Sequence, residues 1–212
     1  MTKRGLFIVF EGIDGSGKGT QMMLLADYIK KIDKYQDILL THEPWKSKEI
    51  KKRLEEEKDA FSSGLDIARL FVKDRADHSK QLIVPHIEDG IFVMCDRYSL
   101  STIAYQSAQG ISISQLIYMH QNKRILKPDV TFFIDVSSNI AEERLQKRGD
   151  KIEKFEKKDF REVLIKQYRD IIRKIQENII HGEKIIVIDG SKDVSSVAEC
   201  IKTEFEKIYH EW

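Results

Sequence analysis

EGIDGSGKGT, residues 11–20, is the stretch that decides the fold. An apolar run at residues 6–10 leads into it, and an amphipathic segment that begins near Gln21 follows it. Its glycines permit backbone conformations with positive φ, which bring N–H groups against an anion. They are Gly12, Gly15 and Gly17. Lys18 follows where a helix would begin, so the order of strand, glycine turn, lysine and helix predicts a phosphate-binding loop.

We expect the loop to hold the phosphates of a nucleotide through its backbone N–H groups and the charge of Lys18. The residues assigned to this contact are Gly12, Ile13, Asp14, Gly15, Ser16, Gly17, Lys18, Gly19 and Thr20. Gly19 stands where a Ser or Thr hydroxyl normally holds Mg²⁺, and Thr20 follows one residue late. A glycine-rich turn without a ligand is the alternative, but such a turn would not need a lysine between two glycines.

Length and charge narrow the class of protein. A chain of 212 residues suits one domain with a sizeable core, so we expect residues 1–212 to form a single domain. The 36 Lys and Arg residues nearly balance the 35 Asp and Glu residues. The formal net charge of +1 therefore gives no reason to expect a nucleic-acid or membrane partner.

The cysteines and the apolar runs bear on the compartment. Two cysteines are too few for a disulfide framework, and Cys95 lies in the apolar run IFVMC, where we expect a buried free thiol. The N-terminal apolar run is too short for a signal peptide, and no run approaches the ~20 apolar residues of a membrane span. These features predict a cytoplasmic protein.

Five short runs rich in Val, Ile, Leu and Phe predict strands, at residues 6–10, 38–41, 91–95, 130–136 and 184–188. Helical patterns lie between and after them, at residues 18–32, 65–89, 138–147, 160–181 and 194–211. The charged segment 46–59 is interpreted as a solvated helix. Because the strand runs are continuous rather than alternating, they indicate strands covered on both faces. We predict an α/β fold, a doubly wound parallel five-stranded sheet flanked by helices.

Ligands of such sheets bind beyond the carboxyl ends of the strands, so the residues after each run matter most. Asp96 ends the third run, at the position where a carboxylate that holds Mg²⁺ or its water shell is expected. Asp14 and Thr20 are the other candidate ligands. Two carboxylates beside phosphates would repel a substrate unless a divalent cation lay between them, which argues for Mg²⁺. A helix N-cap is the alternative role for Asp96.

Arg97, directly after Asp96, can bind a phosphate with two parallel N–H groups, which lysine cannot do. The alternative is a structural ion pair with Asp14 or Glu43. Two charged residues that end a buried strand are costly unless a site uses them, and this favours the phosphate.

Together these residues resemble the thymidylate kinases, P-loop kinases of nucleoside monophosphates with a short lid. The resemblance covers nearly the whole chain, and the matching blocks follow in the right order. They are FEGIDGSGKGTQ at 10–21, Glu43-Pro44, ARLFVKDRADH at 68–78, DRYSLSTIAYQ at 96–106, KPDVTFFIDV at 127–136, ERLQKRGDKIE at 143–153 and VIDGS at 187–191.

The resemblance implies transfer of the γ-phosphoryl group of ATP to the 5′-phosphate of thymidine monophosphate, with Mg²⁺ and in a homodimer. It implies that Phe71 stacks on thymine, that Arg75, one helical turn later, and Thr102 hydrogen-bond to the base, and that Tyr105 meets the deoxyribose. Arg97 would bind the acceptor phosphate. The full set implied for the acceptor nucleotide is Asp14, His42, Phe71, Arg75, Arg97, Ser101, Thr102, Tyr105 and Gln106.

Structural alternatives exist for three of these side chains. Phe71 and Tyr105 could be ordinary core residues of amphipathic helices. Arg75 could be a solvated residue paired with Asp74 or Asp77.

The cationic segment 144–158 resembles the family's lid, which closes over ATP. The resemblance assigns Arg144 and Gly190 to ATP, and Arg148 and Lys151 to the transferred phosphoryl group, whose developing charge they would stabilise while water is excluded. With Lys18, Arg97 and Asp14 they form the predicted catalytic set. A solvated charge run is the alternative. Lys151 stands where the family commonly has arginine, and Gly15 where some members have one in the loop.

His42 is the largest departure, because the family typically has an arginine before Glu-Pro to bind the acceptor phosphate. Trp45 also replaces a small glycine. A nucleoside monophosphate kinase of another base preference, adenylate- or uridylate-kinase-like, is therefore the nearest alternative. A nucleotide-hydrolysing regulatory switch is the alternative of a different class.

Overall fold

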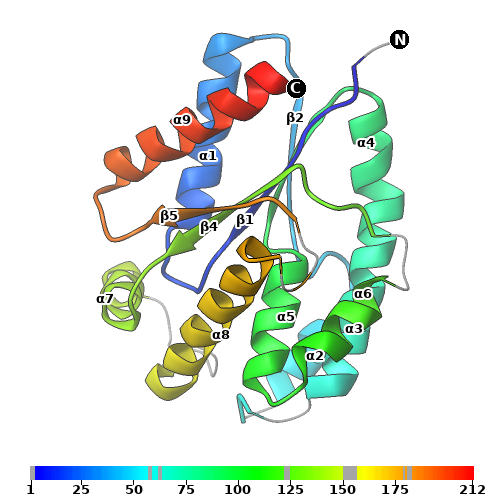
Figure 1. Cartoon of the computed structure of the whole chain (residues 1–212), viewed down its shortest axis with the longest axis vertical. Coiled ribbons are helices and arrows are strands. Elements are labelled where there is room, and N and C mark those ends of the chain that lie inside the picture. Colours follow the sequence, from blue (N-terminus) through cyan, green and yellow to red (C-terminus); the bar gives the residue numbers. More distant parts are fainter. Residues whose placement is uncertain are drawn as a thin grey trace.

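A computed structural model describes residues 3–56, 59–61, 64–121, 125–149, 157–178, 180 and 183–212. One parallel sheet crosses it in the strand order β2-β3-β1-β4-β5, which confirms the predicted fold (Figure 1). The strands are β1 Phe7–Glu11, β2 Ile38–His42, β3 Phe92–Asp96, β4 Val130–Asp135 and β5 Ile185–Asp189. The chain leaves β1 toward one edge and later continues toward the other, so the carboxyl end of β1 lies where the strand order reverses, a position that favours ligands.

Four strands end one residue later than their apolar runs predict. In these four strands the polar residue after the run still pairs in the sheet, as Asp96 does with Phe10 and Asp189 with Asp135. Glu11 and Asp96 are therefore held by strand geometry, which fixes where their carboxylates lie.

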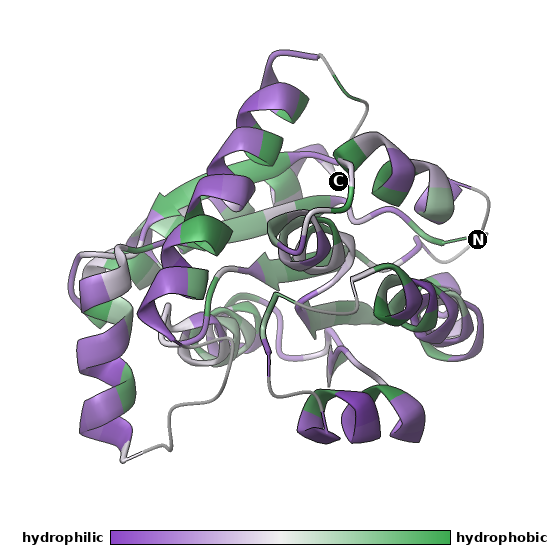
Figure 2. Ribbon diagram, turned by 90° about the horizontal axis from the view of Figure 1, so that it is seen from below, coloured by the Kyte–Doolittle hydropathy of each residue, from purple (hydrophilic) through white to green (hydrophobic). Residues whose placement is uncertain are grey.

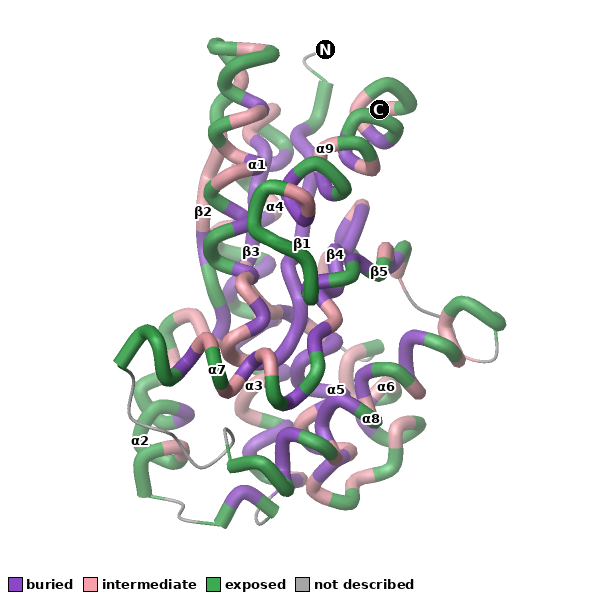
Figure 3. Tube along the Cα trace, turned by 90° about the vertical axis from the view of Figure 1, so that its left-hand side faces the viewer, coloured by how far each residue is buried: buried purple, intermediate pink, exposed green. Residues whose placement is uncertain are grey.

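Helices cover both faces of the sheet (Figures 1 and 3). Helices α1 Lys18–Ile32 and α9 Val194–Glu211 pack on the face that carries Ile8 and Phe10, and the alternate residues of β1 face the other side. That side is covered by α4 Val84–Glu88, α5 Ser99–Ala108 and α8 Lys158–Gln176. Figure 2 shows hydrophobic strands between helices whose outward faces are hydrophilic.

The remaining helices are α2 Lys48–Glu56, α3 Gly64–His78, α6 Ile113–Gln121 and α7 Ser138–Arg148. Most of α2 is exposed, as predicted for the charged segment. Cys95 is buried and unpaired, also as predicted. The helices predicted from the sequence included neither α5 nor α6. Helix α5 buries Ser, Thr and Gln side chains, which the periodicity of apolar residues does not detect. Within the described ranges, none of the helices has the length and apolar character that crossing a bilayer requires.

The predicted helices at 65–89 and 160–181 are corrected by the structure. The first is α3, a π-helical turn at Ser79–Ile83, and α4. Pro85 has no N–H to donate to the preceding turn, so the regular ladder is interrupted there. The second helix ends at Gln176, because Asn178 adopts a left-handed φ of 56°.

Glu183, just before β5, carries a prediction for the pH dependence of stability. It accepts hydrogen bonds from Thr131 Oγ1 at 2.7 Å and Ser99 Oγ at 3.3 Å, while burial raises its pKa from 4.5 to about 7. The folded state then binds more protons than the unfolded state between these values, so this residue lowers stability as the pH rises from 4.5 to 7. We therefore expect the unfolding free energy of Glu183→Gln, relative to that of the wild type, to increase by up to about 3 kcal/mol as the pH rises from 4.5 to 8.

Urea unfolding of both proteins at several pH values measures this gain. An equal difference in unfolding free energy at pH 4.5 and pH 8 would show that Glu183 does not titrate in this range.

Candidate active site

The loop between β1 and α1 has the conformation that its glycines predict. Gly15 has φ 82°, and a Cβ there would lie 2.5 Å from the carbonyl oxygen of Ala141. Gly12, at φ 144°, is similarly restricted, with a Cβ 2.8 Å from Ser16 Oγ. Both positions therefore require glycine. Lys18 begins α1, and its buried Nζ donates a hydrogen bond to the Ile13 carbonyl at 3.0 Å.

A cavity of about 250 Å³ lies on one side of this loop. Arg144 of α7 donates to the carbonyl oxygens of Ser16, at 3.2 Å, and Gly190, at 2.8 Å, and so connects the loop with the segment after β5. The residues predicted to contact ATP that line this cavity are Gly15, Ser16, Gly17, Thr20, Arg144 and Gly190, and Arg148, predicted to act on the transferred phosphoryl group, lines it too. Residues from three distant parts of the sequence thus surround one space beside the phosphate loop.

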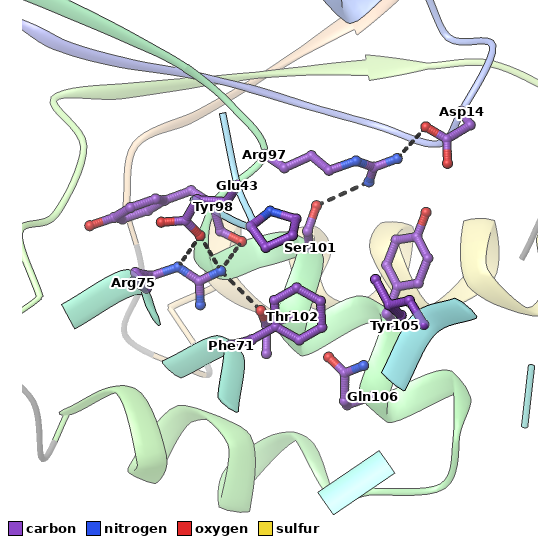
Figure 4. A pocket seen from close by; sticks show the side chains of 12 residues that line it. Asp14, Glu43, Phe71, Arg75, Arg97, Tyr98, Ser101, Thr102, Tyr105 and Gln106 are labelled. Carbon is purple, nitrogen blue, oxygen red and sulfur yellow. Dashed lines mark hydrogen bonds and ion pairs between the residues drawn. The ribbon is translucent and has the colours of Figure 1, made fainter. Parts of the chain in front are cut away.

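A second cavity, of about 170 Å³, lies on the other side of the loop (Figure 4). The residues predicted to contact the acceptor line it, with the exception of His42: Asp14, Phe71, Arg75, Arg97, Ser101, Thr102, Tyr105 and Gln106. Figure 4 shows the Arg97–Asp14 pair on one side and Arg75, with Glu43 and Thr102, on another. We refer to this space as the acceptor cavity and to the previous one as the donor cavity.

His42, a predicted acceptor residue, and Trp45, a second departure from the family's pattern, are not among the residues that line the acceptor cavity. His42 ends β2, and its side chain is exposed. The Trp45 ring stacks on His78 with centroids 5.0 Å apart, and its backbone N–H donates to Asp74 Oδ2 at 2.5 Å. The departures from the family's pattern at these positions therefore lie outside the described lining of the cavity.

Arg97 forms the ion pair with Asp14 and also lines the acceptor cavity. Its Nη2 donates to Asp14 Oδ1 at 2.6 Å and its Nη1 to Ser101 Oγ at 3.2 Å, while the same side chain lines the acceptor cavity. The backbone of Arg97 has φ 68°, a strained conformation that is found mostly at functional sites. Burial raises the pKa of Asp14, but the charges of Arg97 and Lys18 outweigh it and bring the pKa to about 2.

Arg75 is buried, which excludes the solvated role. Its Nε donates to Glu43 Oε2 at 2.8 Å, and its Nη2 donates to the Tyr98 carbonyl at 2.9 Å and to Thr102 Oγ1 at 3.0 Å. Asp74 does not pair with it; this carboxylate accepts backbone N–H groups of residues 45–47 and so fixes the loop after β2 on α3.

A buried polar network behind Arg75 was not predicted. Glu43 Oε1 lies 3.1 Å from His78 Nδ1, and His78 Nε2 lies 3.0 Å from Thr41 Oγ1. Both partners of His78 are far away in the sequence, so only the fold could reveal the contacts. Glu43 and His78 stand in two of the blocks that carry the family resemblance, Glu43-Pro44 and ARLFVKDRADH, and this was the available signal.

The aromatic residues of the acceptor cavity differ in burial. Phe71 is half-buried and belongs to the cavity lining rather than to the described hydrophobic core clusters. Tyr105 packs against the core, with its ring centroid 6.1 Å from that of Phe160, and also lines the cavity. The core alternative is thus excluded for Phe71 and holds in part for Tyr105.

Glu11 is a buried carboxylate that the sequence analysis missed. Its Oε1 accepts the backbone N–H groups of Tyr98, at 2.8 Å, and Ser101, at 2.9 Å, at the start of α5. Its Oε2 accepts the hydroxyl protons of Ser101, at 2.6 Å, and Tyr168, at 3.2 Å. Burial raises the pKa of Glu11, although the hydrogen bonds from α5 lower it. These hydrogen bonds attach the start of α5, which carries Ser101 and Thr102, to the end of β1 beside the phosphate loop.

The carboxylates beside the phosphate loop fit a magnesium ion. Asp96 Oδ1 is buried and has no hydrogen-bond partner among the described residues, and Tyr98, not Asp96, occupies the N-cap position of α5. In the same ranges no three His, Cys, Asp or Glu side chains form a metal cluster of their own. Mg²⁺ usually takes only one or two carboxylates and completes its shell with phosphates and water, so Asp14 and Asp96 suit it. Thr20, in contrast, is exposed in the donor cavity.

The predicted lid is described in part. Arg148 is the last residue of α7 and lines the donor cavity, and its charge contributes to the low pKa of Asp14. Lys151 lies outside the described residues.

Comparisons with known proteins identify the family of the chain. Residues 10–201 match the model of the family described as "Thymidylate kinase". The chain is similar to a "Probable thymidylate kinase" of Archaeoglobus fulgidus, 34% identical over 95% of each chain. A "Probable thymidylate kinase" of Pyrococcus horikoshii is 40% identical over 73% of this chain and 79% of its own chain. A "Thymidylate kinase" of Wolbachia pipientis is 36% identical over 89% of this chain and 88% of its own. The chain belongs to the thymidylate kinase family.

Proposed function

We propose that this protein transfers the γ-phosphoryl group of ATP to the 5′-phosphate of thymidine monophosphate, giving ADP and thymidine diphosphate. One observation carries the proposal: Asp14 lines the acceptor cavity and its neighbour Gly15 lines the donor cavity. Nucleotides in the two cavities would therefore meet end to end at the phosphate loop. Such positioning supplies much of the rate of phosphoryl transfer.

On the donor side, the loop N–H groups and Lys18 would hold the phosphates of ATP, because the loop glycines allow close approach and α1 adds its positive end. Arg144 and Gly190, which line the donor cavity, would contact the remainder of the ATP molecule. The distance of 3.9 Å from Lys18 Nζ to Oδ1 of Asp14, a residue that lines the acceptor cavity, supports this role of the lysine.

On the acceptor side, Phe71 would stack on the base, and Arg75 and Thr102 would hydrogen-bond to its polar edge. Tyr105 would pack against the deoxyribose. Arg97 would bind the acceptor phosphate with two N–H groups, exchanging its bond to Asp14 for the nucleotide. Ser101 and Gln106 complete the wall; Gln106 Oε1 is buried and without a partner among the described groups, which leaves it available to a ligand.

Asp14 and Asp96 would hold Mg²⁺ directly or through its water shell, with Thr20 as a further candidate on the donor side. When bound, the ion supplies positive charge between the phosphates of the two nucleotides.

Residues 144–158 would form the lid of a single kinase domain, residues 1–212. Arg148 and Lys151 would bring positive charge to the transferred phosphoryl group as the lid excludes water. The homodimer is also a proposal, and the mass of the protein in solution tests it.

A panel of acceptors tests the proposed function. With ATP and Mg²⁺, we expect thymidine monophosphate to be phosphorylated in preference to AMP, CMP, GMP and UMP, because Phe71, Arg75 and Thr102 line the acceptor cavity together. A coupled assay of ADP formation gives kcat/KM for each acceptor. Preference for AMP or UMP would contradict the base assignment, and ADP formation that does not depend on an acceptor would favour a regulatory switch.

A further inference from the structure

His120, on α6, forms part of the wall between the acceptor cavity and a neighbouring space. Its Nε2 lies 2.7 Å from Nη1 of Arg75, which lines the acceptor cavity. On its other side, His120 lines a mostly apolar cavity of about 280 Å³ between α5, α6 and α8. Helix α6 contributes no described residue to the lining of the acceptor cavity. Through His120 it nevertheless contacts the guanidinium of Arg75, which belongs to a lining residue.

The direction of this hydrogen bond follows from the chemistry of the two groups. A guanidinium has no acceptor, so Arg75 Nη1 donates and His120 Nε2 accepts. The ring proton must then be on Nδ1, which lies 2.7 Å from the Leu116 carbonyl and donates to it. Burial and the charge of Arg75 lower the pKa of His120 to about 3, which is consistent with a neutral ring.

The acceptors around Arg75 leave one of its nitrogens only partly used. Nε–H goes to Glu43 Oε2, which also lies 2.6 Å from Nη2, and Nη2 donates in addition to Tyr98 and Thr102. His120 accepts one of the two hydrogens of Nη1, and in the described part of the chain no other group accepts from this nitrogen. One N–H of Nη1 thus has no acceptor among the described residues, and it belongs to a side chain that lines the acceptor cavity.

A fixed N–H donor distinguishes ligands by the atom that faces it. A carbonyl oxygen accepts the hydrogen bond, whereas an amino group brings a second donor and leaves both unpaired, which is costly in a buried site. Glu43, Tyr98 and Thr102 all contact Nε or Nη2, so His120 alone among the described residues restrains Nη1 by a hydrogen bond. The direction of the remaining N–H therefore depends on α6.

We propose that His120 is a positioning residue for base selection: it orients Arg75 so that the remaining N–H meets a carbonyl oxygen of the base, and so favours a pyrimidine with a 4-oxo group over one with a 4-amino group. This inference rests on the proposed function, because it concerns the acceptor of that reaction.

Two substitutions of His120 and one control test the proposal. His120→Leu removes the acceptor, and we expect KM for thymidine monophosphate to rise about 10-fold to 100-fold, with little change in kcat or in KM for ATP. The ratio of kcat/KM for thymidine monophosphate over deoxycytidine monophosphate should fall by a similar factor. His120→Gln keeps an acceptor, and most of the loss should be recovered. His86 is the matched control, because its Nδ1 also lies 2.7 Å from the carbonyl oxygen four residues earlier. His86 is not among the described lining residues of either nucleotide cavity, so His86→Leu should leave these constants unchanged.

The outcomes separate the possibilities. The proposal is overturned if His120→Leu leaves KM for the acceptor within about twofold of the wild type. It is also overturned if His120→Leu raises KM for both ATP and the acceptor and lowers the melting temperature, because a merely structural role would produce that combination. If the wild-type protein prefers another nucleoside monophosphate, the proposed function fails. The same comparison of His120→Leu with His120→Gln on that preferred acceptor then decides the role of His120.

Discussion

Replacement of Lys18 by alanine is expected to lower kcat for phosphoryl transfer by ~10³-fold or more. The Nζ atom of Lys18 donates to the Ile13 carbonyl at 3.0 Å and lies 3.9 Å from Oδ1 of Asp14, which lines the acceptor cavity. Charge develops on the γ-phosphate oxygens during transfer, and a fixed cation in a site shielded from water stabilises it strongly. Steady-state kinetics with ATP and thymidine monophosphate measures the loss.

The folding of this variant should not suffer, which makes the result interpretable. Burial, followed by the charge of Arg97, lowers the pKa of Lys18, so its ammonium is a cost to the folded state rather than a gain. We expect the melting temperature of Lys18→Ala to equal or exceed that of the wild type. Lys18→Met, which keeps the aliphatic chain, should behave in the same way. Lys31, exposed in the last turn of α1, is the matched control, and Lys31→Ala should keep full activity. Retention of more than about a tenth of kcat in Lys18→Ala would contradict the assigned role.

The parts of the site that the sequence predicted are those set by local geometry. The phosphate loop follows from the glycines and Lys18, since three positive φ angles and a helix start lie within a few residues. Phe71 and Arg75 share one face of α3 because they are four residues apart. Asp96 and Arg97 follow from the end of a buried strand, where the topology of a parallel sheet brings ligands.

The parts that the sequence did not predict depend on contacts between distant segments. Glu11 reads as the end of an apolar run, yet its partners are the N–H groups at the start of α5, 87 and 90 residues away. His120 meets Arg75 across 45 residues, and periodicity offered no helix at that point. A buried charge signals that a partner exists, but the residue type alone cannot say which partner the fold supplies.

Arg97 combines local strain with a long-range contact, and its substitution should have the second large effect. Arg97→Lys keeps the positive charge but replaces a planar fork with a point donor, so we expect kcat/KM for the acceptor to fall by ~10²-fold. Arg97→Gly should lose ~10³-fold, because no cation then faces the acceptor phosphate. Initial rates at limiting thymidine monophosphate measure both losses.

The strain at residue 97 allows the catalytic loss to be separated from a folding defect. The φ of 68° costs an arginine about 1 kcal/mol or more but costs glycine little, so Arg97→Gly should be at least as stable as Arg97→Lys while being less active. Arg169 serves as the exposed control, because it pairs with the carboxylate of Asp135 through Nε, at 3.0 Å, and Nη2, at 3.1 Å. Arg169→Lys should retain full kcat/KM. If activity instead followed stability, with Arg97→Gly the more active variant, Arg97 would be a strand-end ion pair with Asp14 and not the phosphate ligand.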